Sequence, residues 1–354
     1  MTCRPHASAL ILLLICILCL PAPAVAERAG LTITAVGDIM PSSSFPAPKY
    51  LSTIPDEVFA TTFARILGDA DVRFGNLEGT MAGDAPCLKA CKNSTTCYAF
   101  NIPFGYADIL KRGGFNLFSL ANNHISDFGE PGRRRTVARL GESGIACAGT
   151  LEKPWDILYA NGLYIGFAAF APHKGVADLL DRDAAVRRVR TLSNICDMVI
   201  VSMHGGAEGK GAEHVPRAAE TYLGENRGDL HGFAHDVVDA GADLVIGHGP
   251  HVVRGMELYK GRLIAYSLGN FFTWARFNLD GPKGLAPVLN VSLAPDGRFV
   301  EGRIHSLRQP YKSLPVNDPS HGAAREAARL SLEDFPESPL HISDQGVLSV
   351  RDKG

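Results

Sequence analysis

The sequence predicts an α/β domain with a largely buried sheet, and three observations support this prediction. Short apolar runs alternate with segments of helical spacing from residue 31 onward. Glycine often closes the helical segments, as is common at helix C-termini. The apolar runs are nearly continuous rather than alternating with polar residues, which is typical of strands covered on both faces.

The elements follow from this alternation in chain order. Strands are expected at residues 31–36, 71–77, 115–121, 163–171, 197–203, 243–247 and 262–268. Helices are expected at residues 56–70, 106–114, 132–144, 183–194 and 229–242. Residues 288–307 predict a hairpin that turns at Asp296-Gly297. The main domain is expected to cover residues 27–310, and residues 311–354 are expected to form a peripheral tail.

The N-terminus has the pattern of a secretory signal. An arginine precedes the apolar stretch ALILLLICILCL, and the segment ends in Ala24-Val25-Ala26. Cleavage after Ala26 would export the chain to the periplasm or the exterior. An uncleaved membrane anchor is the alternative, although the stretch is shorter than the roughly 20 residues of a spanning helix.

Export affects how the cysteines are interpreted. Cys87, Cys91, Cys97, Cys147 and Cys196 would remain, and CLKACKNSTTC indicates either a disulfide-tied loop or a zinc knuckle. The formal charge of −2 provides no basic surface for nucleic acid.

Polar side chains follow five of the expected strands. They are Asp38; Asn76 and Glu78; Asn122, Asn123 and His124; His204 and Glu208; and His248 and His251. The carboxyl ends of parallel strands lie along one edge of an open sheet, where ligands bind. Carboxylate, amide and imidazole groups together suit zinc, manganese or iron. His248 and His251 flank a rigid Gly-Pro, which favours a two-imidazole clamp.

Other polar features are less specific. His231 and His235 share one helix face, but no third ligand is evident nearby, so we interpret them as a solvated or core-edge pair. His173 follows a strand and is an outside candidate for the site. Arg133 to Arg135 are expected on a solvated helix face. Ser267 lacks the Gly-x-Ser-x-Gly setting of a nucleophile.

These motifs carry a family resemblance. AVGDIM, GNLEGT, LANNHISDFG, MHGGAE and GADLVIGHGPHVVRGMELYKGRLIAYSLGNF occur in the order typical of the bacterial capsule-synthesis CapA family of poly-γ-glutamate biosynthesis proteins. The resemblance covers residues 31–275. That family resembles the calcineurin-like metallophosphoesterases, which implies a four-layer αββα sandwich. It also implies exported proteins that make, anchor or release an anionic γ-linked glutamate polymer, and a membrane capsule synthase is a candidate partner.

The metallophosphoesterase pattern transfers position by position. Asp38 matches the first aspartate, Asn123 and His124 match the Asn-His pair, and His204, His248 and His251 match the last three histidines. Met40 stands in place of an expected histidine, and Asn76 in place of the bridging aspartate, for which Glu78 is a substitute. Gly205 and Gly249 replace a tryptophan and a histidine of the commoner motif forms.

The number of metals follows from electrostatics. Two close dications need a bridging carboxylate to offset their repulsion, and neutral Asn76 does not supply that charge. We therefore expect one tightly bound ion, held by Asp38 or Glu78 with the three histidines.

Three functions are consistent with this site. The first is a metal-dependent hydrolase or transferase acting on γ-glutamyl amides, in which Glu208 or Glu257 moves the proton and His124 stabilises the oxyanion. The second is a non-catalytic factor that binds the polymer and assists a membrane synthase. The third is a phosphoesterase, for which no phosphate-cradling loop is evident. Substrate contacts are expected from Asn76, Asn122, Asp127 and Asn270.

Overall fold

The computed structural model describes residues 30–90 and 98–351, which form two main sheets and six α-helices within those ranges. Its helices are α1 (Asp56–Leu67), α2 (Tyr106–Arg112), α3 (Gly129–Glu142), α4 (Arg182–Ile195), α5 (Leu230–Asp239) and α6 (Gly322–Asp334). Short 3-10 turns lie at Pro48–Tyr50 and Gly281–Gly284. The predicted signal segment, Cys91 and Cys97 fall outside the described residues. Cys87, Cys147 and Cys196 carry free thiols.

The larger sheet has ten strands. Its strands are β1 (Leu31–Met40), β2 (Val72–Leu77), β3 (Leu117–Ser119), β4 (Ala146–Ala148), β13 (Asn270–Thr273), β14 (Leu285–Leu293), β15 (Phe299–Arg308), β16 (Val316–Asn317), β17 (Leu340–Ile342) and β18 (Val347–Val350). Strands β1 to β4 run parallel, and β13 lies parallel to β1. Strands β14 and β15 form the hairpin predicted around Asp296-Gly297, antiparallel to β1.

The smaller sheet has six strands. They are β5 (Trp155–Ala160), β6 (Leu163–Phe170), β7 (Met198–His204), β10 (Leu244–His248), β12 (Arg262–Ala265) and β11 (Met256–Tyr259). The four central strands run parallel, and the edge strands β5 and β11 are antiparallel to their neighbours. A separate ribbon joins β8 (Glu220–Tyr222) and β9 (Glu225–Gly228).

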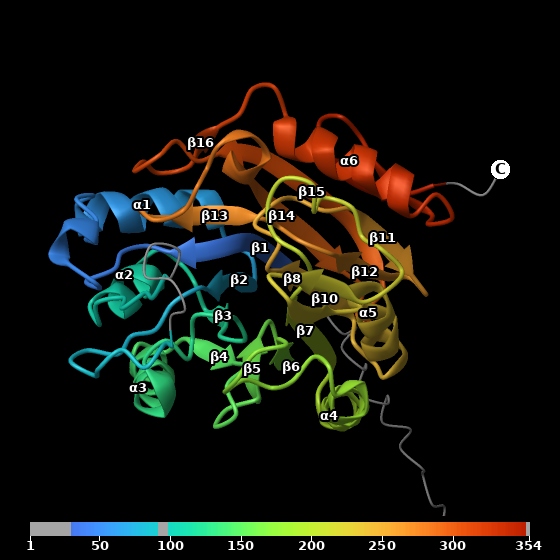
Figure 1. Cartoon of the computed structure of the whole chain (residues 1–354). Coiled ribbons are helices and arrows are strands. Elements are labelled where there is room, and N and C mark those ends of the chain that lie inside the picture. The colour runs from blue at the N-terminus through green and yellow to red at the C-terminus, as the bar shows by residue number, and fades with distance from the viewer. Residues whose placement is uncertain (1–29, 91–97, 352–354) are drawn as a thin grey trace, which may run out of the picture.

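The two sheets face each other and are covered by helices on their outer sides (Figure 1). Side chains along β7 alternate between two buried faces of the smaller sheet. Met198 and Ile200 join the core between the sheets, whereas Val199 and Val201 join the core beneath α4 and α5. Phe74 of β2 lies with its ring centroid 5.7 Å from that of Phe167 on β6, across the interface. Helices α1 and α2 lie against the opposite face of the larger sheet. This arrangement confirms the predicted four-layer αββα sandwich.

The segment after residue 311 is not a peripheral tail. Helix α6 buries Ala323, Ala324, Ala327 and Leu330. It contacts β15 and β14 of the larger sheet and β11 of the smaller one. The Ser331 hydroxyl accepts a hydrogen bond from the Met256 amide at 2.8 Å. The C-terminal segment is therefore an integral part of the sandwich, because α6 packs on strands of both sheets.

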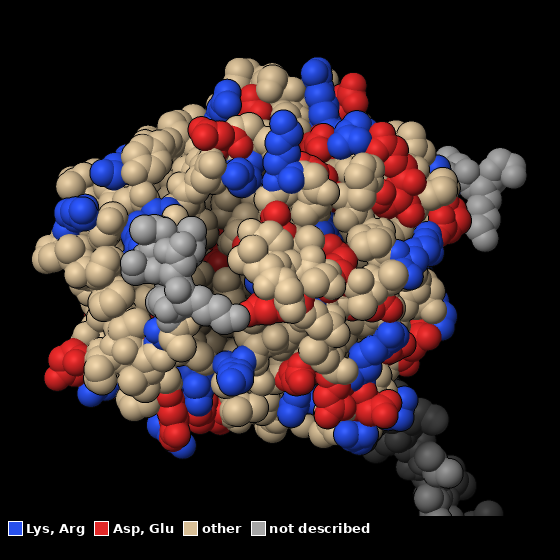
Figure 2. All heavy atoms as spheres, in the orientation of Figure 1, with Lys and Arg blue, Asp and Glu red and all other residues tan. Residues whose placement is uncertain are grey.

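The described part of the surface carries no extended charge of one sign in the view of Figure 2, where basic and acidic side chains are interspersed. This agrees with the formal charge of −2. Each helix within residues 30–90 and 98–351 is too short or too polar to cross a bilayer.

Candidate metal centre and ligand pocket

Strand register brings the predicted ligands to one edge of each sheet. Asp38 on β1 is in register with Asn76 on β2 and with Asn270 on β13. His204, at the end of β7, is in register with His248 at the end of β10. The two edges meet because the sheets are packed face to face, and the Phe74 ring lies 5.6 Å from the His248 ring.

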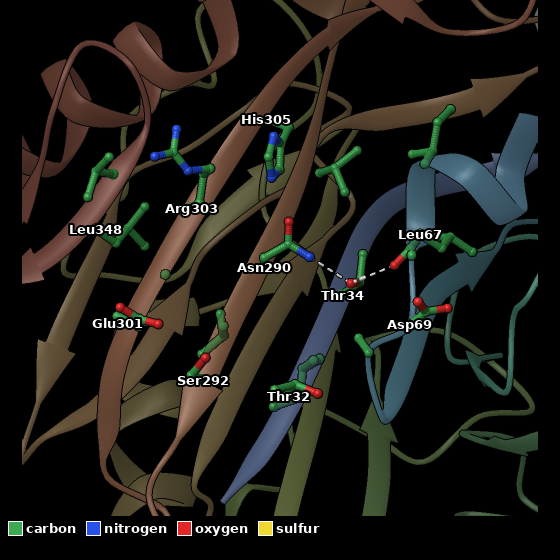
Figure 3. Close-up of a pocket in the computed structure, with 18 of the residues that line it drawn as sticks. Thr32, Thr34, Leu67, Asp69, Asn290, Ser292, Glu301, Arg303, His305 and Leu348 are labelled. Atoms are coloured by element: carbon green, nitrogen blue, oxygen red, sulfur yellow. Dashed lines mark hydrogen bonds between the residues drawn. The ribbon is translucent and has the colours of Figure 1, made fainter.

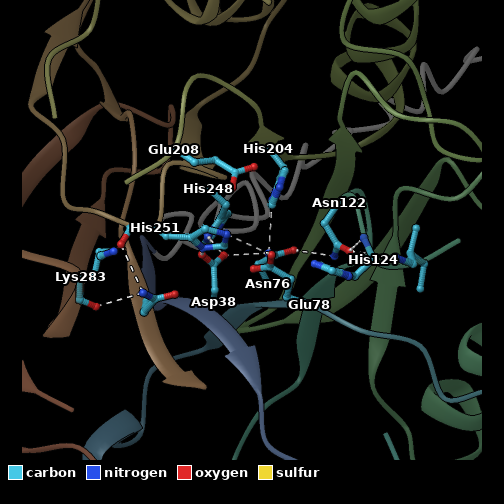
Figure 4. Close-up of polar contacts among 12 residues, drawn as sticks. Asp38, Asn76, Glu78, Asn122, His124, His204, Glu208, His248, His251 and Lys283 are labelled. Atoms are coloured by element: carbon cyan, nitrogen blue, oxygen red, sulfur yellow. Dashed lines mark hydrogen bonds and ion pairs between the residues drawn. The ribbon is translucent and has the colours of Figure 1, made fainter. Parts of the chain in front are cut away.

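Asp38 lies at the centre of the cluster (Figure 4). Its Oδ2 lies 2.9 Å from His251 Nδ1, and its Oδ1 lies 3.3 Å from His248 Nδ1. The Nε2 atom of His251 lies 3.4 Å from Glu78 Oε1. Asp38, Glu78 and His251 therefore present ligand atoms within 4.8 Å of one another. The structure brings together side chains that are more than two hundred residues apart in the sequence.

Several ligand atoms here are buried and lack a hydrogen-bond partner among the described residues. They are both carboxylate oxygens of Glu78, Oδ1 of Asn123, Nε2 of His204, and both ring nitrogens of His248. Asp38, Glu78, His204 and His248 are wholly buried. Buried polar atoms without partners carry a desolvation cost of about 1–3 kcal/mol each, more for a charged group. A divalent cation would satisfy this donor set, so the residues present fit a metal.

The charges in the cluster lead to the same conclusion. Burial would raise the pKa of Asp38, but the neighbouring imidazoles of His248 and His251 bring it well below its usual range. Burial raises the pKa of Glu78 well above its usual value. The pKa of His251 is about 10 despite burial, because Glu78 and Asp38 stabilise its positive charge. Asp38 is therefore ionised beside a protonated His251, whereas burial disfavours the charged form of Glu78.

The two amides Asn76 and Asn122 support the ligands. Asn76 Nδ2 donates to Asp38 Oδ1 at 2.8 Å, and Asn76 Oδ1 accepts from Asn122 Nδ2 at 3.1 Å. Asn122 also donates to the Leu77 carbonyl at 2.9 Å. Both amides are thus engaged within the protein, so the predicted substrate contacts from Asn76 and Asn122 become a role in positioning Asp38.

His124 is held by an aspartate at the pocket wall. Its Nδ1 lies 2.9 Å from Asp127 Oδ2, and the other Asp127 oxygen lies 2.8 Å from Lys89 Nζ. Asp127 is buried and also accepts from the Phe100 amide. Burial lowers the pKa of His124. The sequence predicts that Asp127 contacts substrate. In the structure it orients His124 instead.

His173 lies beside the cluster, with its ring centroid 6.0 Å from that of His204. Its Nε2 is buried and has no hydrogen-bond partner among the described residues. Burial lowers its pKa to about 3, so the ring is neutral. His173, which follows a strand in the sequence, thus lies beside the site.

A cavity of about 680 Å³ opens above the cluster, and its cationic wall was not predicted. Arg227, Arg276 and Lys283 line it, as do His124, Asn123, Asn270, Glu208 and His251. Asn270 Nδ2 donates to the carbonyls of Lys283 and His251 at 3.0 and 3.3 Å, while its Oδ1 is left without a partner among the described residues. Glu208 pairs with Arg227 at 2.9 Å.

The arginine Arg276 is packed among aromatic rings on the same wall. Its guanidinium carbon lies 4.8 Å from the Tyr98 ring centroid, 4.9 Å from that of Tyr50 and 5.7 Å from that of Phe100. Such stacking fixes the planar guanidinium, and its Nη1 donates to the Ala99 carbonyl at 3.3 Å. Residues 274–280 are irregular chain after β13, and Lys283 lies in the short 3-10 turn Gly281–Gly284, so no periodic signal could have marked them.

The structure corrects the expected role of Glu257. This residue lies on β11, and its Oε1 accepts from the Tyr266 hydroxyl at 2.6 Å and lies 2.8 Å from His235 Nε2. It is in register with Ile264, whose side chain belongs to the core beneath α5. Glu257 thus faces away from the cavity and does not serve as its proton carrier. Sequence reasoning could not determine which face an edge strand presents.

A larger cavity, of about 1010 Å³, lies on the outer face of the larger sheet between the end of α1 and β18 (Figure 3). Two of its polar side chains are joined by hydrogen bonds: Asn290 Nδ2 donates to Thr34 Oγ1 at 2.7 Å, and that hydroxyl donates to the Leu67 carbonyl at 2.9 Å. Among the described residues, its lining includes none of the buried polar atoms that lack a partner. Size alone therefore does not make it the functional site.

Comparison with known proteins places the chain in a family. A family model described as "Bacterial capsule synthesis protein PGA_cap" matches residues 32–274. The chain is 28% identical to the capsule biosynthesis protein CapA of Bacillus anthracis over 268 residues, covering 69% of this chain and 60% of that protein. It is 29% identical to the PGA biosynthesis protein CapA of Bacillus subtilis over 179 residues, covering 46% of this chain and 44% of that protein. The chain thus spans less than two thirds of the length of each.

A solved structure of lower similarity is the 5′-nucleotidase precursor from Thermus thermophilus, at 13% identity and a TM-score of 0.44, covering 79% of this chain and 55% of that chain. The family match extends over the strand ends that carry Asp38, Asn76, His124, His204 and His248. On this match, the chain belongs to the bacterial capsule synthesis protein PGA_cap family.

Proposed function

We propose that this chain takes part in the synthesis, anchoring or release of poly-γ-glutamate or a related anionic envelope polymer, which it binds across a divalent-metal site. The observation that carries the proposal is the position of the buried, unpartnered ligand atoms beneath a cavity with a cationic wall. The names of the two Bacillus relatives support the polymer class. We further propose export, on the basis of the N-terminal 26 residues.

The cationic wall suits a polymer with one free carboxylate per unit. Arg276 would form bidentate hydrogen bonds to a carboxylate, and Lys283 would add a mobile positive charge beside it. Arg227 is already paired with Glu208, so it contributes less net charge. Binding should therefore weaken as salt rises, because counterions screen exposed charge pairs.

In the enzymatic form of the proposal, the metal would be zinc, manganese or iron held by Asp38, Glu78, His204, His248 and His251. Such a metal polarises a carbonyl and lowers the pKa of water to supply a nucleophile. Asn76 would hold Asp38 in its ligating position through the 2.8 Å hydrogen bond.

His124 would carry the proton. Its Nδ1 is engaged by Asp127, so proton exchange with a ligand in the cavity falls to Nε2. The buried Asp127 carboxylate would stabilise the imidazolium as His124 takes up a proton. This arrangement suits proton transfer better than the oxyanion stabilisation expected from the sequence. Glu208 would be a second proton carrier only after release from Arg227.

A second candidate function is a polymer-binding factor without catalysis that assists a membrane synthase. The observation that favours it is the neutral Asn76 at the central position of the cluster, where its amide donates to Asp38. Without a bridging carboxylate, a second close metal is not stabilised. One metal and a cationic wall are sufficient to bind an anionic chain.

The test incubates the purified protein with γ-linked polyglutamate and zinc or manganese, and follows polymer length by size-exclusion chromatography. Binding is measured separately by fluorescence anisotropy of labelled polymer. The enzymatic form predicts cleavage that His248→Ala abolishes, because His248 is buried in the cluster with both ring nitrogens unpartnered. His305→Ala, an exposed histidine on the outer face of the larger sheet, is the matched control.

Binding without cleavage, weakened at least tenfold in an Arg276→Ala/Lys283→Ala variant, would identify the accessory function. The proposal as a whole fails if the wild-type protein neither cleaves nor binds the polymer at physiological salt with metal present. Cleavage that survives His248→Ala would place the chemistry elsewhere in the molecule.

A further inference from the structure

A second group of metal-ligating side chains lies on the opposite side of the smaller sheet. His231 and His235 project from α5, and Glu257 comes from β11 more than twenty residues later. Their ligand atoms lie within 4.8 Å of one another. Both imidazole Nε2 atoms approach the same carboxylate oxygen, at 2.8 Å for His235 and 4.0 Å for His231. The third ligand that the sequence did not reveal is thus supplied by the neighbouring strand.

The three side chains are held in place by their surroundings. Glu257 is only 3% exposed, and Tyr266 donates to its Oε1 at 2.6 Å. The His235 ring stacks on Tyr259 with ring centroids 3.7 Å apart. Buried ligands oriented by an outer hydroxyl or by ring stacking are typical of metal sites in proteins. The side chains of His231 and His235 remain 13% and 22% exposed, so water can complete the coordination.

The distances require only small adjustments to hold an ion. Zinc binds imidazole nitrogen and carboxylate oxygen at about 2.0–2.2 Å, which places two tetrahedral ligand atoms about 3.3 Å apart. The His235–Glu257 pair would open by about half an ångström, and the His231–Glu257 pair would close by about 0.7 Å. Histidines at i and i+4 on one helix face are a spacing that binds zinc.

Arg217 competes for this position. Its Nη1 lies 3.1 Å from His231 Nε2, and its guanidinium also pairs with Glu337. The Arg217 side chain is 50% exposed, so it can turn into solvent. Burial and the neighbouring His235 lower the pKa of His231, which keeps that ring neutral and able to bind a metal. A bound dication would displace Arg217 and replace the 2.8 Å contact between His235 and Glu257.

We propose that His231, His235 and Glu257 form a second divalent-metal site of the zinc class, separate from the cluster around Asp38. Its ligands join α5 to β11, and both elements contact the C-terminal segment through Phe335 and α6. The site would therefore stabilise the junction between the smaller sheet and α6. It does not depend on the proposed polymer function.

The test measures zinc bound to the purified full-length protein by equilibrium dialysis, for the wild type and for variants of each site. His235→Ala should lose the equivalent of zinc bound at the His231, His235 and Glu257 site. Asp38→Asn/His248→Ala should lose the equivalent bound at the cluster around Asp38 and retain the one bound beside His235. Arg217→Ala should bind this equivalent at least threefold more tightly, because the competing cation is gone. Cobalt added to Asp38→Asn/His248→Ala should give visible absorption bands. Adding His235→Ala to that double variant should remove them.

Thermal unfolding gives an independent readout. Zinc should raise the unfolding midpoint of Asp38→Asn/His248→Ala, and adding His231→Gln, a milder replacement, should remove that increase. The proposal is overturned if His235→Ala and the wild type bind equal amounts of zinc. It is also overturned if Asp38→Asn/His248→Ala binds no zinc while it remains folded by circular dichroism.

Discussion

At the residue scale, His251 shows what the buried cluster requires. It lies between two wholly buried carboxylates, at 2.9 Å from Asp38 and 3.4 Å from Glu78. Burying two carboxylates costs several kcal/mol each unless a cation compensates them. Protonated His251 meets that need without metal, and a divalent ion would meet it with the proton released. Metal binding should therefore be accompanied by proton release.

Gly249 supports the site through a close backbone contact. A Cβ atom there would lie 2.6 Å from the Gly205 carbonyl oxygen, and the backbone has φ +112°. The two glycines, where the resemblance leads one to expect histidine and tryptophan, thus lie against each other. In this conformation a side chain at Gly249 would meet the Gly205 backbone, and a Cβ atom at Gly205 would lie 2.6 Å from the Arg227 carbonyl oxygen.

We predict that Gly249→Ala lowers the free energy of unfolding by roughly 2–4 kcal/mol, from backbone strain and the clash together. Denaturant unfolding measures the loss. Gly211→Ala is the matched control, because its φ is +94° but open space surrounds it. Backbone strain alone should cost that variant roughly 1–2 kcal/mol. Equal losses in the two variants would show that the Gly205 contact is unimportant.

At the element scale, the sequence was most informative where strands are buried and parallel. The alternation of β1, β2, β7 and β10 with helices was visible, and so were the side chains that follow them, because strand ends share one edge. Helix α6 was missed because it follows the proline- and serine-containing stretch YKSLPVNDPSH, which is typical of irregular chain. Strand β5 was missed because it lies at an edge and is only partly buried.

The site residues that follow parallel strands were predicted from the sequence, and those from other segments were not. Asp38, Asn76, Glu78, Asn123, His124, His204, His248 and His251 converge as expected. Glu257 did not, because its strand is antiparallel and the sequence does not show which face it presents. Arg276 and Lys283 were missed because irregular chain and a single 3-10 turn carry no periodic pattern. The pairing of His235 with Glu257 depends on the contact between α5 and β11, which no local pattern encodes.

Directly before β10, Asp243 is a buried carboxylate that makes stability depend on pH. Asp243 accepts from the Val199 amide at 2.9 Å, and burial raises its pKa from 3.8 to about 6. A raised acid pKa means that the folded state holds the proton more tightly than the unfolded chain. This contribution to stability is therefore complete below pH 3.8 and is lost as the pH rises to about 6.

We predict that Asp243→Asn, which keeps an acceptor for Val199, raises the free energy of unfolding at pH 8 by up to about 3 kcal/mol. At pH 4 the variant and the wild type should be nearly equal. Asp239→Asn, an exposed carboxylate on α5, serves as the control. Denaturant unfolding at several pH values measures the difference. A difference between Asp243→Asn and the wild type that stays constant from pH 4 to pH 8 would contradict this assignment.

At the scale of the whole molecule, the site exists because two sheets with different strand orders bring their edges together. The larger sheet contributes Asp38, Asn76 and Glu78, and the smaller contributes His204 and His248. The C-terminal segment holds the two sheets together at their other end through α6. Neither sheet alone carries a complete ligand set, so metal binding reports on the whole sandwich.

The most direct measurement is anomalous scattering from crystals of the full-length protein grown with zinc or manganese. We predict one strong peak within coordination distance of Asp38, His204 and His248, whatever is found beside His235. A second peak of equal strength within about 4 Å of the first would contradict the single-ion site. Crystals that contain the metal but show no peak beside Asp38 would contradict the metal centre itself.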